Sequence, residues 1–66
     1  MANEEMKIAF IRVLEEDAAQ FEKLADNLEQ LLPHLTGDKK LYEIEVEYRR
    51  SLAKQHRLLI ELVKNS

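Results

Sequence analysis

Hydrophobic side chains recur every three or four residues through the first half of the chain, with one polar interruption at Asp17. This spacing is typical of one face of a helix and is similar to the heptad pattern of coiled coils. The recurring residues are Phe10, Leu14, Phe21, Leu24, Leu28, Leu31 and Leu35. The pattern predicts a helix over about residues 3–33, which is about 46 Å long at 1.5 Å per residue.

The second half of the chain repeats this pattern, and Gln55 is its polar interruption. The recurring residues are Leu41, Ile44, Tyr48, Leu52, Leu59 and Leu62. We therefore expect a second helix of similar length over about residues 38–64.

The only proline and the only glycine lie close together between these two patterns, at Pro33 and Gly37. Proline removes a backbone donor and ends or kinks a helix near Leu31, and Gly37 suits a left-handed C-cap. Asp38 is then the N-cap of the second helix, with Thr36 as the alternative. A turn at 34–37 between helices of equal length predicts an all-α fold, a single antiparallel helical hairpin over residues 1–66.

Both helices carry more hydrophobic surface than one neighbour can cover. The apolar arcs span about 160° on the first helix and about 200° on the second, whereas about 100° suffices for a single contact. We expect the recurring residues above to pack between the helices and the surplus to form one open binding face. That predicted face consists of Ile11, Ala18, Ala25, Leu32, Tyr42, Val46, Arg49, Ala53, Ile60 and Val63.

A chain of 66 residues is short for an independent core, and the sequence offers few other means of stabilisation. It contains no cysteine, so disulfides are excluded, and its two histidines, His34 and His56, lie too far apart for a His-rich metal site. We expect no metal and no cofactor. The hairpin is instead predicted to complete its core by association with another chain, either a second copy of itself or a different helical protein.

The net charge of −3 argues against nucleic-acid binding, which normally needs a basic face. Residues 1–35 carry a net charge of −5 and residues 36–66 a net charge of +2, so the two helices attract each other weakly. No hydrophobic run approaches the roughly 20 residues of a membrane span, and the N-terminus lacks the layout of a signal peptide. We therefore expect a cytoplasmic location.

No pattern of catalytic residues is found, and we predict that the chain is not an enzyme. There is no phosphate-binding loop and no zinc-protease motif. Carboxylate pairs such as Glu15 and Glu16 lie opposite the apolar arcs, where solvent surrounds them, whereas acid–base catalysis needs desolvated groups. The basic residues near Arg49 alternate with acidic ones, which indicates helix salt links such as Glu45–Arg49.

The two polar interruptions are expected at one level of the hairpin, with Asp17 beside Gln55 and His56. A polar layer of this kind fixes the register of a coiled coil. A pair between Asp17 and the imidazolium of His56 is one hypothesis, and a partly exposed His56 without such a pair is the alternative.

Residues 37–63 resemble a known family. The stretch Gly37-Asp38-Lys39-Lys40-Leu41-Tyr42, followed by Leu52, Leu59, Ile60 and Val63, is similar to the second half of the small type III secretion co-chaperones, the YscE-like proteins. The resemblance implies a helical hairpin that binds a tetratricopeptide-type chaperone and helps to keep the needle subunit soluble in the cytoplasm. Pro33, just before the turn, departs from that family's pattern.

A second hypothesis from another functional class remains. Two such hairpins would form a homodimeric four-helix bundle, similar to the small RNA-binding proteins that control plasmid copy number, or a regulator that inhibits an enzyme. The acidic first helix weakens the RNA-binding version.

Overall fold

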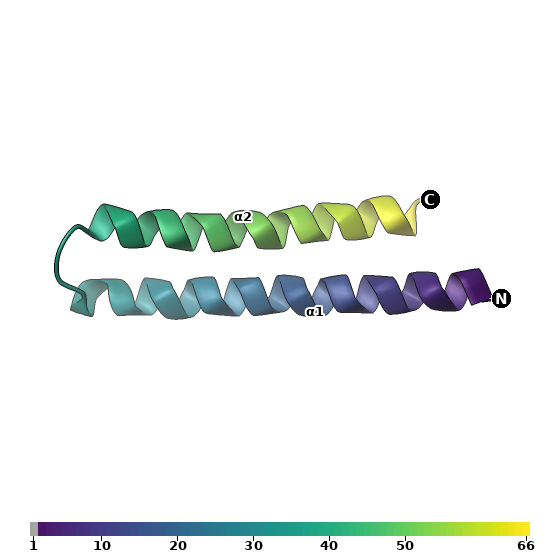
Figure 1. Ribbon diagram of the computed structural model, residues 1–66, viewed down its shortest axis with the longest axis horizontal. Helices are drawn as coiled ribbons and strands as arrows, with labels where there is room; N and C mark the ends of the chain where they lie inside the picture. The colour runs from purple at the N-terminus through teal and green to yellow at the C-terminus, as the bar shows by residue number, and fades with distance from the viewer. Residues whose placement is uncertain (1) are drawn as a thin grey trace.

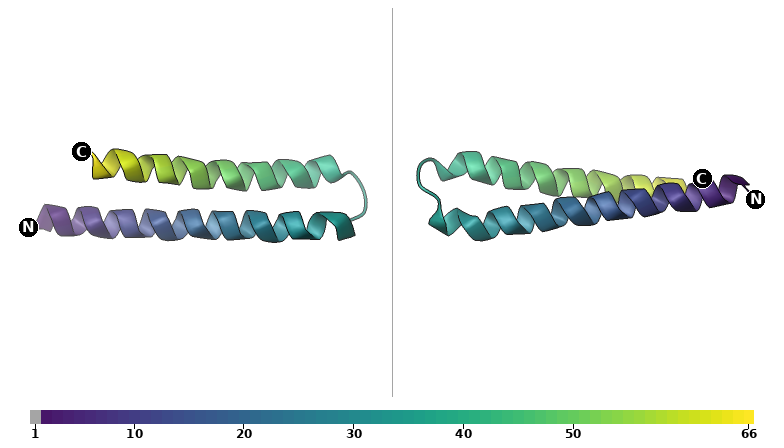
Figure 2. Two further views of the ribbon diagram at one scale, coloured as in Figure 1. Left: turned by 180° about the vertical axis from the view of Figure 1, so that it is seen from behind. Right: turned by 60° about the horizontal axis from the view of Figure 1, so that its bottom comes forward.

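The computed structural model describes residues 2–66 and shows two long helices joined by a short connection (Figure 1). Helix α1 spans Ala2–Leu31 and continues as a single 3-10 turn, η1, over Leu32–His34. Helix α2 spans Lys39–Lys64. The helices run antiparallel and lie side by side, with the connection at one end and both termini at the other (Figure 2). An all-helical hairpin is therefore confirmed.

Local chemistry at the connection explains why the chain reverses there. Regular α-helix ends at Leu31, and Pro33 occupies the 3-10 turn, as expected for a residue that cannot donate to the helical ladder. Gly37 has a φ of +94°, a conformation that side-chain-bearing residues rarely adopt. Asp38 caps α2, because its carboxylate accepts a 3.0 Å hydrogen bond from the backbone N–H of Lys40. Of the two expected caps, Asp38 is the correct one.

The molecule is a thin rod with little interior. Its dimensions are 54 × 15 × 10 Å, and its radius of gyration of 15.6 Å exceeds the roughly 11 Å of a compact chain of this length. The most completely buried residues are Ala18 and Ala25, each with 0% of its surface exposed. The other buried residues are Leu14, Val46, Ala53 and Ile60.

These six residues belong to a continuous seam between the helices. Along α1 and α2 the seam residues follow one another at alternating steps of three and four, the spacing of an antiparallel coiled coil. They are buried or half-buried, apart from Tyr42, which is 38% exposed. The seam consists of Ile11, Leu14, Ala18, Phe21, Ala25, Leu28 and Leu32 on one helix and Tyr42, Val46, Arg49, Ala53, His56, Ile60 and Val63 on the other.

The prediction that this set forms an open face is wrong. Ala18, Ala25, Val46, Ala53 and Ile60 are buried against the opposite helix. Small side chains let two helices approach closely, so the alanine-lined edge of each apolar arc makes the contact and the bulkier edge is left outside. Among the residues expected inside, only Leu14 is buried. Those found exposed instead are Phe10, Leu31, Leu41, Ile44, Tyr48, Leu59 and Leu62.

The proposed pair between Asp17 and His56 is also not formed. Asp17 is exposed, and the ion pairs within residues 2–66 do not include it. The Nδ1–H of His56 donates to the carbonyl oxygen of Leu52 at 2.8 Å, since a carbonyl can only accept. The imidazole ring packs edge-on against Phe21, with ring centroids 5.2 Å apart. His56 is therefore a seam residue held by its own helix and by one aromatic contact.

A substitution in the seam tests its position. Ile60 is 4% exposed and its neighbour Leu58 is 61% exposed. Replacing Ile60 by Ala should lower the free energy of unfolding by about 2–5 kcal/mol, because it removes buried methyl groups and leaves a cavity. Replacing Leu58 by Ala, the matched control, should change it by less than about 1 kcal/mol. Urea unfolding followed by circular dichroism measures both free energies. Equal losses of stability in the two variants would contradict the placement of Ile60 in the seam.

Candidate interaction surface

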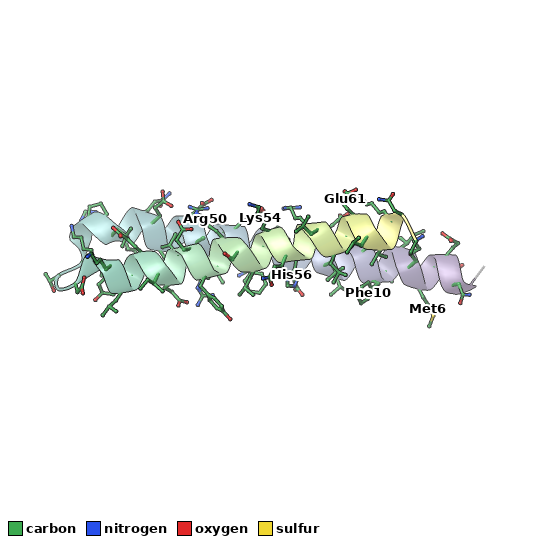
Figure 3. The ribbon with its side chains drawn as sticks, turned by 90° about the horizontal axis from the view of Figure 1, so that it is seen from above. Met6, Phe10, Arg50, Lys54, His56 and Glu61 are labelled. Carbon is green, nitrogen blue, oxygen red and sulfur yellow. The ribbon has the colours of Figure 1, made fainter. Side chains whose placement is uncertain are left out.

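The two long sides of the hairpin that flank the seam differ in chemistry. Viewed from above, with α2 in front of α1, Met6 and Phe10 project on one side of the rod, and Arg50, Lys54 and Glu61 project on the other (Figure 3). We call the first side the apolar face and the second the charged face. The molecule is therefore amphipathic across its width, although each helix contributes residues to both faces.

The apolar face consists of large hydrophobic side chains that the hairpin leaves in solvent. Their exposed fractions range from 41% at Leu59 to 71% at Met6. On each helix these side chains are offset from the seam in the same rotational direction. Because the helices run antiparallel, both sets therefore lie on the same side of the hairpin. The members are Met6, Phe10, Val13 and Leu31 from α1 and Leu41, Tyr48, Leu59 and Leu62 from α2. The exposed Ile44 and Leu58 lie on the side of α2 that points away from the seam.

Two half-buried leucines and a central polar segment complete the apolar face. Leu24 and Leu52 lie beside the seam on this side and are partly accessible. Asp17, Gln20 and Gln55 interrupt the hydrophobic residues midway along the rod and are exposed. The face therefore has a hydrophobic region at each end and a polar segment between them.

The charged face is held together by ion pairs that connect α1 with α2. Arg57 binds Glu22 through two parallel hydrogen bonds, Nη2 to Oε1 at 2.6 Å and Nε to Oε2 at 3.0 Å. Arg50 bridges two carboxylates one turn apart, Asp26 at 3.0 Å and Glu29 at 2.5 Å. The acidic partners all come from α1 and the basic ones from α2, so this face joins the helices of one chain.

These contacts shift the proton affinities of the groups involved. Hydrogen bonding from Arg57 lowers the pKa of Glu22 below its ordinary value, and the same contact raises the pKa of Arg57. Hydrogen bonds to Glu29 and then Asp26 raise the pKa of Arg50. All of these side chains remain solvent-exposed, so each pair contributes little to stability by itself.

Arg49 is the charged residue that lies inside the seam. Its guanidinium pairs with Glu45 one turn earlier at 2.9 Å, which confirms the helix salt link expected from the sequence. Its Nε is buried and has no hydrogen-bond partner among residues 2–66.

Residues 2–66 provide no clear metal site, enclosed pocket or membrane-spanning segment. No group of three or more histidine, aspartate or glutamate side chains in residues 2–66 has the geometry to hold a metal ion. The surface hollows are open depressions, such as one between Glu15, Arg57 and Lys64. Neither α1 nor α2 contains a stretch that is long and apolar enough to cross a membrane.

The comparisons with known proteins provide no relative: no protein-family description, curated protein or solved structure matches this chain.

The sequence contains a signal that distinguishes the two edges of the apolar arcs. Along α1 the positions flanking the alanine edge are Glu15, Glu22 and Glu29, and along α2 they are Arg50, Arg57 and Lys64. Acidic residues opposite basic ones beside a seam stabilise that pairing and disfavour the alternative. Hydrophobic spacing, the property on which the expected seam was based, is a weaker guide to the seam than this charge pattern.

The Glu22–Arg57 pair predicts a pH dependence of stability. Because the pKa of Glu22 is lowered in the folded state, its stabilising contribution is present above the ordinary value of 4.5 and is lost as pH falls through the folded pKa. Glu22→Gln should lower the thermal midpoint at neutral pH and have little effect at a pH well below that range. Glu61→Gln is the control, since Glu61 makes none of the ion pairs found in residues 2–66. An equal effect of Glu22→Gln at both pH values would contradict the pairing.

Proposed function

We propose that this chain is a non-enzymatic helical binding module that packs its apolar face against helices of another chain. The observation that carries this proposal is the alignment of exposed hydrophobic side chains from both helices on one side of the rod. Met6 is 71% exposed, Tyr48 58% and Leu62 69%. Isolated exposed hydrophobic residues are ordinary on a protein surface, but clusters of them at both ends of one face are typical of an interaction site.

The opposite side of the molecule supports the same assignment. The guanidinium groups of Arg50 and Arg57 are bound by carboxylates of α1. Phosphate recognition needs basic groups that are available to the ligand, and these two are engaged within the chain. The charged face therefore stabilises the hairpin, and the apolar face is the surface available for binding.

A cellular context for the module comes from the sequence resemblance. Residues 37–63 resemble the small type III secretion co-chaperones, so we propose that the partner in the cytoplasm is a tetratricopeptide-type chaperone for the needle subunit. Such chaperones are stacked helix pairs with extended surfaces, which suit a long, straight hydrophobic strip. Tyr48 and Phe10 are the large aromatic residues that the apolar face offers as anchors.

A double substitution on the apolar face tests this function. Replacing Tyr48 and Leu59 by Glu should abolish binding to a purified tetratricopeptide-type needle chaperone from the same organism, because charges would be buried without partners. Helicity should remain, since both residues lie outside the seam and are 58% and 41% exposed. Isothermal titration calorimetry and circular dichroism on the same samples measure the two effects.

The matched control adds the same two charges away from the apolar face. Ala19 and Gln30 are exposed on α1 and point away from both the seam and the apolar face. Ala19→Glu with Gln30→Glu should bind like the unmodified chain. No binding by the unmodified chain would refute the chaperone partner, and unchanged binding by the Tyr48/Leu59 variant would refute the apolar face as the binding surface.

A further inference from the structure

We infer that the free chain pairs with a second copy of itself through the side of α2 that faces away from α1. The two α2 helices lie antiparallel in a coiled coil, and α1 of each copy lies on the outside. This contact goes beyond the proposed function, since it depends on α2 alone. It accounts for Ile44 and Leu58, which are 63% and 61% exposed and belong neither to the seam nor to the apolar face.

The outward side of α2 carries a heptad pattern of its own. Its positions follow one another at alternating steps of three and four from Leu41 to Leu62, which is the spacing of a coiled-coil strand over three heptads. Leu58 lies two residues from the seam residue Ile60, or about 200° around the helix, so this pattern lies almost opposite the seam. Figure 3 is seen from this side, with α2 in front. We call the set the outer stripe, and its exposed members are Leu41, Ile44, Tyr48, Ser51, Gln55, Leu58 and Leu62.

The hydrophobic members of the outer stripe match those of an antiparallel copy. With Ser51 on the two-fold axis, residues almost equally far from Ser51 on opposite sides of it face each other. Leu41 then lies level with Leu62 of the second copy, and Ile44 lies level with Leu58. Hydrophobic residues therefore meet hydrophobic residues at both ends of the contact, which is what association requires.

The polar members of the outer stripe meet at its centre. In the same register, Ser51 lies beside Ser51 of the second copy, and Tyr48 lies level with Gln55. Hydroxyl and amide groups each donate and accept hydrogen bonds, so these side chains satisfy one another across the contact. A central polar layer of this kind fixes the register of a coiled coil.

The charges beside the outer stripe are complementary to themselves when the helix direction is reversed. Lys40, Glu47, Lys54 and Glu61 follow one another every seven residues along its edge on the charged-face side and alternate in sign. Lys54 and Glu61 project on that side in Figure 3. In the antiparallel register, Lys40 faces Glu61 of the second copy and Glu47 faces Lys54. Reversal therefore places every charge of this edge opposite a charge of the other sign.

The seam shows what such an edge does when its partner is present. Arg50 and Arg57 border the seam on α2, also seven residues apart, and carboxylates of α1 bind both. By contrast, none of the four charged residues beside the outer stripe takes part in the ion pairs found within residues 2–66. They are available to a second copy, and charges in these positions set the partner and orientation of a coiled coil.

A parallel second copy would leave these charges without partners. In a parallel coiled coil, such an edge position lies against the position five residues further along the other helix. Glu47 would then lie against Leu52, and Lys54 against Leu59. The charge pattern therefore favours the antiparallel arrangement.

Self-pairing and the proposed partner compete for part of the surface. Leu41, Tyr48 and Leu62 belong to both the outer stripe and the apolar face, whereas Phe10 and Val13 of α1 lie outside the self-contact. A second copy therefore covers the outward side of α2 until the partner displaces it.

Analytical ultracentrifugation of the purified chain without any partner tests the self-contact. We expect a mass about twice the 7.8 kDa of one chain. The Ile44→Glu, Leu58→Glu variant should have the mass of a single chain, and the Ala19→Glu, Gln30→Glu control should remain a dimer. A monomeric unmodified chain would overturn the inference, as would a dimer that the Ile44/Leu58 variant leaves intact.

A charge reversal tests the antiparallel arrangement and changes only exposed residues. Lys54→Glu brings two carboxylates together at each Glu47 contact and should raise the dissociation constant of the dimer about tenfold. Adding Glu47→Lys restores opposite charges between the copies and should recover most of that loss. Seven residues, about 10 Å, separate positions 47 and 54 on one helix, whereas pairs within a helix form three or four residues apart. Recovery therefore reports a contact between copies, and its absence in sedimentation equilibrium would overturn the arrangement.

The two proposals fail in different ways. If the unmodified chain is monomeric but binds the chaperone through the apolar face, self-pairing is refuted and the binding-module function stands. If the chain is a dimer that the Ile44→Glu, Leu58→Glu substitutions dissociate but no chaperone binds, self-pairing stands and the chaperone partner is refuted.

Discussion

The close approach of two helices over alanines determines the rest of this structure. Ala18, Ala25 and Ala53 lose 98–100% of their exposure, since 0–2% of each remains accessible. Where side chains are small, helix axes come nearer and more backbone and side-chain atoms reach van der Waals contact. This close approach limits the hydrophobic stabilisation of the hairpin, because a seam of small residues buries few methyl groups. The larger hydrophobic side chains, such as Phe10 and Tyr48, remain outside.

Ion pairs specify which edge of each apolar arc becomes the seam. Hydrophobic burial does not distinguish the two edges strongly, because each is lined with hydrophobic residues and each would pack in a coiled-coil pattern. Surface ion pairs are individually weak, but Glu22–Arg57 and the bridge from Arg50 to Asp26 and Glu29 form only when the alanine edges meet. Their contribution is therefore to specificity: they favour one of two similar packings.

The fold could be predicted from sequence because its determinants are local. Pro33, Gly37 and Asp38 each act through their own backbone or through a neighbour two residues away, so the connection follows from residue type. The seam could not be predicted from hydrophobic spacing alone, because it depends on which helix edges meet in three dimensions. Hydrophobic spacing placed Phe10 and Tyr48 inside and Ala25 and Val46 outside, and the structure reverses both. The open hydrophobic face was consequently predicted on the wrong side of the hairpin.

A narrow seam and an unfilled apolar face together link folding to association. Helices in proteins gain most of their stability from tertiary packing, and here a single helix–helix contact of mostly small residues provides that packing. Any chain that binds only the folded hairpin adds free energy of stabilisation in proportion to the logarithm of its concentration over its dissociation constant. Leu14 and Ile60 in the seam maintain the hairpin that presents Tyr48 and Leu59 to solvent. Under the proposed function, a partner chain buries Tyr48 and Leu59 and in turn holds the two helices in place. The apolar face then completes the core of a 66-residue chain that has no cysteine for disulfides.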